Sequence, residues 1–385
     1  MSVTAAQGFE ASGVAVALKS TGRPDVAVVV NRGPLKVGAA VFTSNRAKAN
    51  PILWSQQAVA DGVVEAIVLN SGGANCFTGC FGFQTTHQTA ERAGELLGVS
   101  AGDVLVCSTG LIGSGDEVFR AKVLEGVERG VAALAPDGGD DAAAAIMTTD
   151  TVPKTAVHVG DGWTIGGMAK GAGMLAPGLA TMLVVITTDA VLDAAQADAA
   201  LRTATRVTFD RLDSDGCMST NDQVTLLASG ASGVTPDLDG FTAALSEVCA
   251  DLARQLQGDA EGASHDITIE VVHAASESDA VEVGRSVARN NLFKAAVFGN
   301  DPNWGRVLAA IGTTDAQFDP YDVDVWMNGV RVCTAGGPDR PRDDVDLTPR
   351  ATHVVIDLRT GDATATILTN DLTHDYVHEN SAYSS

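Results

Sequence analysis

Short, continuously apolar runs are the feature that most constrains how this 385-residue chain can fold. Runs of this kind, bounded by turn residues, are typical of buried strands. Segments of helical periodicity lie between them without a regular strand–helix rhythm, so the sequence predicts a layered α+β fold rather than a doubly wound parallel sheet. The expected strands are 26–30, 66–69, 104–106, 182–186 and 267–272, and the expected helices are about 86–98, 116–133, 193–205, 240–257 and 278–291.

An Asn-Gly pair between two alternating runs is the strongest hairpin signal in the chain. Asn328 and Gly329 interrupt the apolar alternation of residues 322–332, which predicts two strands joined by a tight turn. A second hairpin is expected within 352–368, turning at 360–362. No low-complexity linker divides the chain into clear domains.

The chain carries a formal net charge of −23. Such a surface repels phosphate groups and anionic lipids, so we expect neither nucleic acid nor a membrane as a partner. The longest apolar run, at 182–186, is too short to span a bilayer, and no signal peptide is visible at the N-terminus. The six cysteines form no CxxC pair and are expected to be free thiols, which predicts a cytoplasmic protein.

Several common catalytic and metal-binding motifs are missing from the sequence, including HExxH, a P-loop with its lysine, and the GxSxG nucleophile elbow. A Ser-His-Asp triad built from distant residues is still compatible with the sequence. Only His374 and His378 have a metal-like i,i+4 spacing, and a metal site made from that pair alone would be unusual. We therefore expect no metal site.

Residues 168–183 read MAKGAGMLAPGLATML, in which glycines and a proline lead into an apolar run through Thr181. A threonine hydroxyl is a poor nucleophile without an adjacent base. If the Ala180–Thr181 bond were cut, the new α-amino group, with a reference pKa of ~7.7–8.0, could act as that base. A strained turn would favour attack of the hydroxyl on the preceding carbonyl. The alternative is a glycine-rich turn in which Thr181 is an ordinary strand residue.

The sequence CSTGLIG at 107–113 follows one of the expected strands. A Thr-Gly step at a strand end can direct a hydroxyl and a backbone N–H to one point, as in an oxyanion hole. Thr109 and Gly110 are the candidates for that role, and a simple turn is the alternative.

These segments resemble the ornithine acetyltransferase family, also called glutamate N-acetyltransferases, over essentially the whole chain. The long motif around Thr181 is specific, and its combination with two further motifs near the C-terminus makes coincidence negligible. The matching segments are VFTSNRAKANPI (41–52), LNSGGANCFTG (69–79), STGLIG (108–113), IMTTDTVPK (146–154), AKGAGMLAPGLATML (169–183), STND (219–222), DPNWGR (301–306) and ENSAYSS (379–385).

The resemblance implies a layered αββα sandwich similar to N-terminal-nucleophile hydrolases. It also implies self-cleavage before Thr181, which would divide the chain into an α chain, 1–180, and a β chain, 181–385, that share one core. Cleaved pairs of this family associate further, so a heterotetramer is expected.

The implied reaction moves acetyl from N2-acetylornithine to glutamate by a ping-pong mechanism, in the cyclic pathway of arginine biosynthesis. Some members also accept acetyl-CoA as donor. No metal or organic cofactor is implied.

Site residues follow from the resemblance by position. Thr181 matches the nucleophile, with cleavage between Ala180 and Thr181, and Thr109 and Gly110 match the oxyanion hole. Without the resemblance, Lys170 would be interpreted as an ordinary surface lysine. The segment DPNWGR at 301–306 is assigned no role in the reaction, and a packed structural turn is the favoured interpretation of it. The implied substrate-binding residues are Thr148 (with its neighbour Thr149 as the less favoured choice), Lys170, Thr181, Glu261, Asn380 and Ser385.

Two rival functions share parts of this pattern. A self-processing amidase or aminopeptidase on a related fold would use the same nucleophile but release free product to water. A non-catalytic protein that binds small molecules would keep its chain intact.

Overall fold

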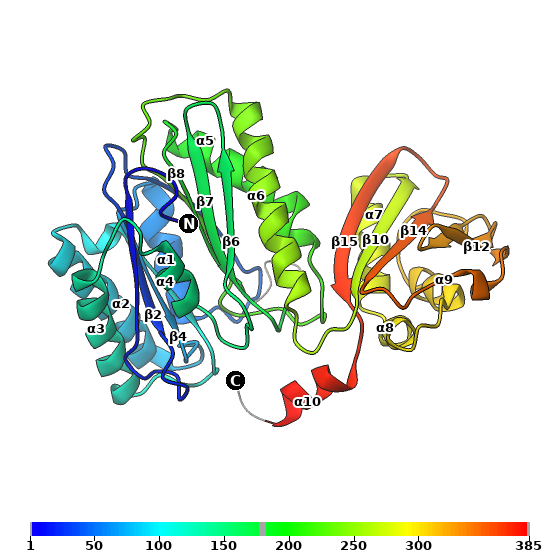
Figure 1. The fold of residues 1–385 in the computed structure, drawn as a ribbon, viewed down its shortest axis with the longest axis horizontal. Helices are drawn as coiled ribbons and strands as arrows, with labels where there is room; N and C mark the ends of the chain where they lie inside the picture. The colour runs from blue at the N-terminus through cyan, green and yellow to red at the C-terminus, as the bar shows by residue number, and fades with distance from the viewer. Residues whose placement is uncertain (1, 177–181, 383–385) are drawn as a thin grey trace.

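The computed structural model describes residues 2–176 and 182–382, and these form a larger and a smaller unit (Figure 1). The larger unit contains two sheets. The first has the strand order β1-β2-β4-β5, in which only β4 and β5 pair in parallel. Its strands are β1 (Phe9–Val14), β2 (Val26–Asn31), β4 (Ala66–Ser71) and β5 (Val104–Thr109).

The second sheet has the order β3-β9-β8-β7-β6, with β8 and β9 parallel and its other pairs antiparallel. Every residue of β8 and β9 is buried, which explains why these strands carry no charge and, apart from threonines and Gln223, are apolar. The strands are β3 (Val37–Phe42), β6 (Lys154–Val159), β7 (Thr164–Lys170), β8 (Leu183–Thr188) and β9 (Gln223–Ala228).

Three apolar layers hold the larger unit together. One lies between the first sheet and helices α2 and α3, a second lies between the two sheets, and a third lies between the second sheet and helices α5 and α6. The predicted αββα sandwich is therefore confirmed, and the layer between the sheets takes residues from both sides of 177–181. The helices of this unit are α1 (Asn50–Ala58), α2 (Gly79–Leu97), α3 (Glu117–Ala132), α4 (Gly139–Ala145), α5 (Ala194–Val207) and α6 (Leu238–Gly258).

The smaller unit has a core of its own, formed by residues 267–367, which no linker signal in the sequence announces. Its sheet has the order β13-β12-β11-β14-β10-β15 and packs against three helices. Its elements are β10 (Asp266–Ala274), β11 (Asp324–Met327), β12 (Val330–Thr334), β13 (Gly337–Pro338), β14 (Ala351–Asp357), β15 (Ala363–Asn370), α7 (Glu277–Ala288), α8 (Asn291–Phe298) and α9 (Trp304–Ile311).

The hairpin at Asn328 and Gly329 is confirmed, since β11 and β12 pair on either side of it. The second predicted hairpin is wrong. The chain does reverse between β14 and β15, but β10 lies between these strands, parallel to β14 and antiparallel to β15. A turn motif predicts that the chain reverses direction, but it does not predict that the two strands it connects will pair with each other. The central place goes to β10, whose Ile267, Ile269 and Val271 are fully buried.

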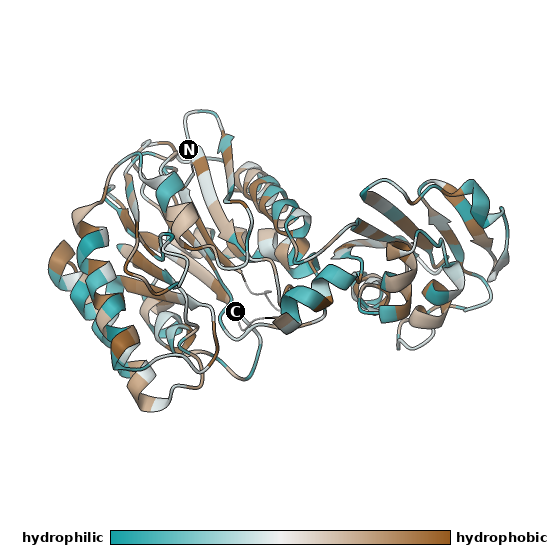
Figure 2. Ribbon diagram, turned by 60° about the horizontal axis from the view of Figure 1, so that its bottom comes forward, coloured by the Kyte–Doolittle hydropathy of each residue, from teal (hydrophilic) through white to brown (hydrophobic). Residues whose placement is uncertain are grey.

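The C-terminal helix α10 (His374–Ala382) leaves the smaller unit and runs back toward the larger one (Figure 1). It has no buried residue and is mostly hydrophilic, in contrast to the strands of the sheets (Figure 2). Among the described helices, none is long and apolar enough to cross a membrane.

Because β10 lies at the centre of the core, shortening one of its buried side chains should strongly destabilise the protein. Because Ile269 is 0% exposed, Ile269→Ala should lower the free energy of unfolding by about 2–5 kcal/mol. Denaturant unfolding of the purified protein measures this. Thr268→Ala, on the partly exposed face of the same strand, should change it by less than about 0.5 kcal/mol. Equal losses in the two variants would contradict the assigned register.

Candidate active site

Two buried strands from different sheets end beside each other and bring two predicted site residues together. Thr109 is the last residue of β5, and Lys170 is the last residue of β7. Lys170 Nζ donates a hydrogen bond of 3.3 Å to Thr109 Oγ1, and both residues are almost fully buried. The donated proton occupies one lone pair of the hydroxyl and leaves the Thr109 O–H hydrogen to point elsewhere.

Gly110 follows Thr109 with φ +124°, in the region that side chains rarely adopt. A Cβ at this position would lie 2.6 Å from Gly73 N and 2.8 Å from Gly72 C, both of them backbone atoms. The turn after β5 therefore requires glycine for two independent reasons. This tight turn sits where the sequence predicts an oxyanion hole.

Lys170 faces one carboxylate that sequence reasoning did not single out. Asp150 Oδ2 lies 3.9 Å from Lys170 Nζ, and the Asp150 side chain is fully buried. Burial lowers the pKa of Lys170, and the charge of Asp150 opposes that effect. For Asp150, burial alone would raise the pKa, but the charges of Lys170 and Lys154 outweigh it and hold the pKa at about 2.

The segment after Lys170 is held in place by hydrogen bonds on its backbone. Gly171 N donates to Asp150 Oδ1 at 2.7 Å, and Met174 N donates to Asp215 Oδ2 at 2.6 Å. Met174 has φ +52°, a left-handed conformation that is strained for a residue with a side chain. The approach to the predicted cleavage site is thus a constrained path, as the glycine-rich sequence suggests.

Ala180 and Thr181 lie outside the described residues. On their C-terminal side, Met182 N donates to Asp222 Oδ1 at 3.1 Å, just before β8 begins. Asp222 is completely buried, and this burial raises its pKa well above the usual range against the opposing effect of the Met182 hydrogen bond. Two carboxyl groups, the half-buried Asp215 and the buried Asp222, therefore anchor the chain on the two sides of the predicted nucleophile.

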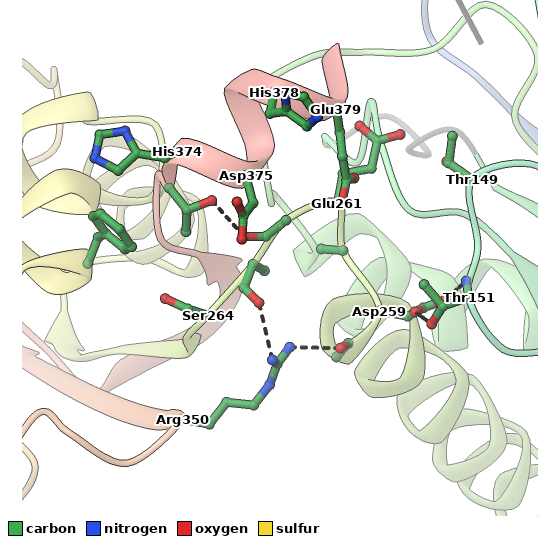
Figure 3. A pocket seen from close by; sticks show the side chains of 16 residues that line it. Thr149, Thr151, Asp259, Glu261, Ser264, Arg350, His374, Asp375, His378 and Glu379 are labelled. Carbon is green, nitrogen blue, oxygen red and sulfur yellow. Dashed lines mark hydrogen bonds between the residues drawn. The ribbon is translucent and has the colours of Figure 1, made fainter. Parts of the chain in front are cut away.

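A pocket of about 740 Å³ lies where α10 passes the end of α6 (Figure 3). Glu261 lines it, and Asn380 Nδ2 donates to Glu261 Oε2 at 2.9 Å, so the structure brings these two predicted residues together. A Cβ on Gly173 would lie 2.4 Å from Glu261 Oε2, which places the carboxylate against the turn that follows Lys170. Ser385 lies outside the described residues.

The pocket wall on α10 adds negative charge beside Glu261. Glu379 lies next to it (Figure 3), and burial together with the charges of Glu261 and Asp375 raises the pKa of Glu379. His374 and His378 also line the pocket, and the His374 ring packs edge-on against Phe298 at 5.5 Å between centroids. Within residues 2–176 and 182–382, no group of three or more His, Cys, Asp or Glu side chains is arranged to hold a metal ion.

Thr148 and Thr149 take different positions. Thr149, which the sequence analysis ranked second, lines the pocket (Figure 3). Thr148 N donates to Asp150 Oδ2 at 2.9 Å, so its backbone is part of the support beneath Lys170. Trp304 begins α9 behind the capping residue Asn303 and packs on the core of the smaller unit, which agrees with a structural role for DPNWGR.

Three charged residues near the site were missed by sequence reasoning, although they lie inside segments that carry the family resemblance. Asp150 and Lys154 lie within IMTTDTVPK, and Asp222 ends STND. Nothing in composition or spacing shows that these charges are buried. The signal is only their position in motifs around the site.

The fold and site together define an αββα enzyme whose pocket suits a small charged molecule. The model of the ArgJ family matches residues 10–385. The arginine biosynthesis bifunctional proteins ArgJ of Streptomyces coelicolor and Streptomyces avermitilis are 63% and 64% identical to this chain over 385 residues, covering all of each sequence. A chain of the Mycobacterium tuberculosis ornithine acetyltransferase, solved with ornithine, is 48% identical, covers 47% of this chain and 96% of its own length, and has a TM-score of 0.45. The chain belongs to the ArgJ family.

Because Asp222 is buried, replacing it with a residue that cannot ionise should make the folded protein more stable. A carboxyl group whose pKa is raised by folding destabilises the folded state as pH rises above its unfolded pKa, and asparagine cannot ionise. Asp222→Asn, which keeps an oxygen for Met182 N–H, should therefore raise the melting temperature, more at pH 8 than at pH 4. Calorimetry in a Thr181→Ala background measures this without differences in chain cleavage.

Asp25→Asn is the matched control for this change. Asp25 is also fully buried, but its carboxylate accepts three backbone N–H bonds, from Val16, Leu18 and Lys19. An amide nitrogen cannot accept these bonds, so this variant should lower the melting temperature. A lower melting temperature for Asp222→Asn at pH 8 would contradict the account of Asp222.

Proposed function

We propose that this chain is an acetyltransferase that moves acetyl from N2-acetylornithine to glutamate through an ester on Thr181. Membership in the ArgJ family and the names of its relatives support this proposal. The structural observation that carries it is the buried Lys170 beside the Thr109–Gly110 turn, with the carboxylate of Glu261 against the same segment of chain.

The charges of the site match those of the proposed substrates. Both substrates carry carboxylates, and the ammonium of Lys170 is available to pair with one of them. N2-acetylornithine also carries a side-chain ammonium, which suits Glu261, whose other face is held by Asn380. An ammonium and a carboxylate on opposite sides of one substrate hold it in a single orientation.

Self-cleavage is the first proposed step at Thr181. The Thr181 hydroxyl attacks the Ala180 carbonyl carbon, and the peptide nitrogen leaves as the new α-amino group. Water then hydrolyses the resulting ester, which leaves a carboxylate on Ala180 and a free hydroxyl on Thr181. The products are the chains 1–180 and 181–385, which stay together because both contribute to the layer between the sheets.

Acetyl transfer uses the same hydroxyl. The α-amino group takes its proton, and the oxygen attacks the acetyl carbonyl of N2-acetylornithine. Thr109 O–H and Gly110 N–H stabilise the oxyanion, and ornithine leaves as its amine takes up the proton. The amine of glutamate then attacks the acetyl ester and restores the free hydroxyl, giving N-acetylglutamate.

The proposal also covers the cofactor requirement, the acetyl donors, the assembly and the location of the enzyme. It needs no metal or organic cofactor, because the residues above supply the base, the nucleophile and the oxyanion donors. Acetyl-CoA is proposed as a second acetyl donor, since the acetyl-enzyme is independent of the group that leaves. We also propose that the cleaved pairs assemble as heterotetramers and act in the cytoplasm.

Removal of the nucleophile tests both of its proposed roles. Thr181→Ala should leave the chain at its full 39.4 kDa and abolish acetyl transfer, as measured by intact mass and product assay. Thr187→Ala, which removes a buried hydroxyl from β8, should still be cleaved. Full activity in Thr181→Ala would exclude the mechanism, and acetate release at the same rate without glutamate would favour an amidase.

Gly110→Ala should lower kcat by roughly 100- to 1000-fold, the usual cost of a lost oxyanion donor. A methyl group there meets the Gly72–Gly73 backbone and must displace the N–H. Gly113→Ala is the control, because Gly113 also has a positive φ, of +84°, but open space around it. Steady-state kinetics compare the two variants, and equal kcat values would argue against an oxyanion role for Gly110.

A further inference from the structure

We propose that Asp150, which Lys154 links to Asp259, is a positioning residue that presents Lys170 to the substrate carboxylate and joins the segments that bind the two ends of the substrate. This inference rests on the proposed function. It assigns a role to a buried network of two lysines and two aspartates that lies beneath the pocket.

The two lysines of this network differ in how completely they are paired. Lys154 is fully buried, and its Nζ contacts Asp150 Oδ1 at 2.7 Å, Asp259 Oδ2 at 2.6 Å and Val152 O at 3.4 Å. Three acceptors satisfy the three protons of an ammonium group. Lys154 therefore has no remaining capacity for a ligand.

Lys170 is equally buried but poorly paired. In the part of the chain that the structure describes, its Nζ has one hydrogen bond, of 3.3 Å to Thr109 Oγ1, and lies 3.9 Å from Asp150 Oδ2. A buried ammonium is costly unless it is paired and hydrogen-bonded. Burial lowers the pKa of Lys170, and the nearby charge of Asp150 opposes this by favouring the ammonium form. The protons of that ammonium not used by Thr109 leave room for a carboxylate from the substrate.

Asp150 also fixes the backbone on which Lys170 sits. Its carboxylate accepts hydrogen bonds from Thr148 N at 2.9 Å and from Gly171 N at 2.7 Å. With Lys154 Nζ, three hydrogen-bond donors thus converge on one buried carboxylate and fix its orientation. Loss of its charge would release both the loop at Thr148 and the turn that follows Lys170.

Asp259 extends the network to the other end of the pocket. It accepts hydrogen bonds from Thr151 N, at 2.9 Å, and from the Thr151 hydroxyl, as Figure 3 shows. Two residues further on, Glu261 N donates to Ala172 O at 2.9 Å. The network therefore joins the three segments that carry Thr148, Lys170 and Glu261, and so sets the separation between the cation and the anion of the site.

Binding of two small ligands separates this role from a purely structural one. Ornithine carries a carboxylate, and putrescine is the same diamine without it. In Asp150→Asn, the Kd of ornithine should rise roughly ten- to a hundredfold, while that of putrescine should change less than about threefold. Titration calorimetry on the purified wild-type and variant proteins measures both constants without turnover.

Asp189→Asn is the matched control. Asp189 is buried at the other end of β7 and accepts backbone N–H bonds from Thr164 at 2.7 Å and Gln7 at 2.9 Å. This variant should lose stability but keep the wild-type ratio of the two Kd values. Asp259→Asn provides a second test should Asp150→Asn not fold. Its ratio of ornithine Kd to putrescine Kd should also rise, by a smaller factor.

Failure of the positioning role and failure of the proposed function give different experimental results. A proportional loss of ornithine and putrescine binding, or no loss of either, would overturn the role of Asp150. If the wild-type protein transfers no acetyl but ornithine binding still depends on Asp150, the proposed function fails and the positioning role stands. If acetyl is transferred and the Kd ratio is unchanged in Asp150→Asn and Asp259→Asn, the positioning role fails and the proposed function stands.

Discussion

The apolar layer between the two sheets of the larger unit is the constraint on which the site depends. Side chains without charge fill it, among them Leu105 of β5 and Met168 of β7. Charged groups can enter such a layer only where strands end and partners are available. Thr109 and Lys170 occupy those ends, and they meet because β5 and β7 belong to facing sheets. The position of the proposed site is therefore set by sheet packing rather than by a surface loop.

The side-chain carboxyl groups of three aspartates position the backbone around the site. Asp150 supports Lys170, while Asp215 and Asp222 hold the backbone at Met174 and Met182, on either side of the predicted cleavage site. Each buried charge is costly by itself, so the hydrogen bonds it accepts are needed to keep it in place.

The sequence was informative about local structure and much less so about burial and neighbours. The apolar runs and the Asn328–Gly329 turn predict real strands, since their signals depend on residues close in the chain. The expected hairpin at 352–368 failed because β10, from far earlier in the sequence, occupies the place between its strands. Lys170 would pass for a surface lysine without the family resemblance, and the charges of Asp150, Lys154 and Asp259 gave no sign of forming one buried network. Burial depends on contacts across the fold, which composition and spacing do not record.

The most direct test of the account is the intact mass of the C-terminal chain after incubation with N2-acetylornithine in the absence of glutamate. The account predicts that the chain beginning at Thr181 gains the mass of one acetyl group, that peptide mapping locates the group on Thr181, and that added glutamate removes it. Product formed only when both substrates are present, with no acetylated chain at any time, would contradict transfer through a Thr181 ester.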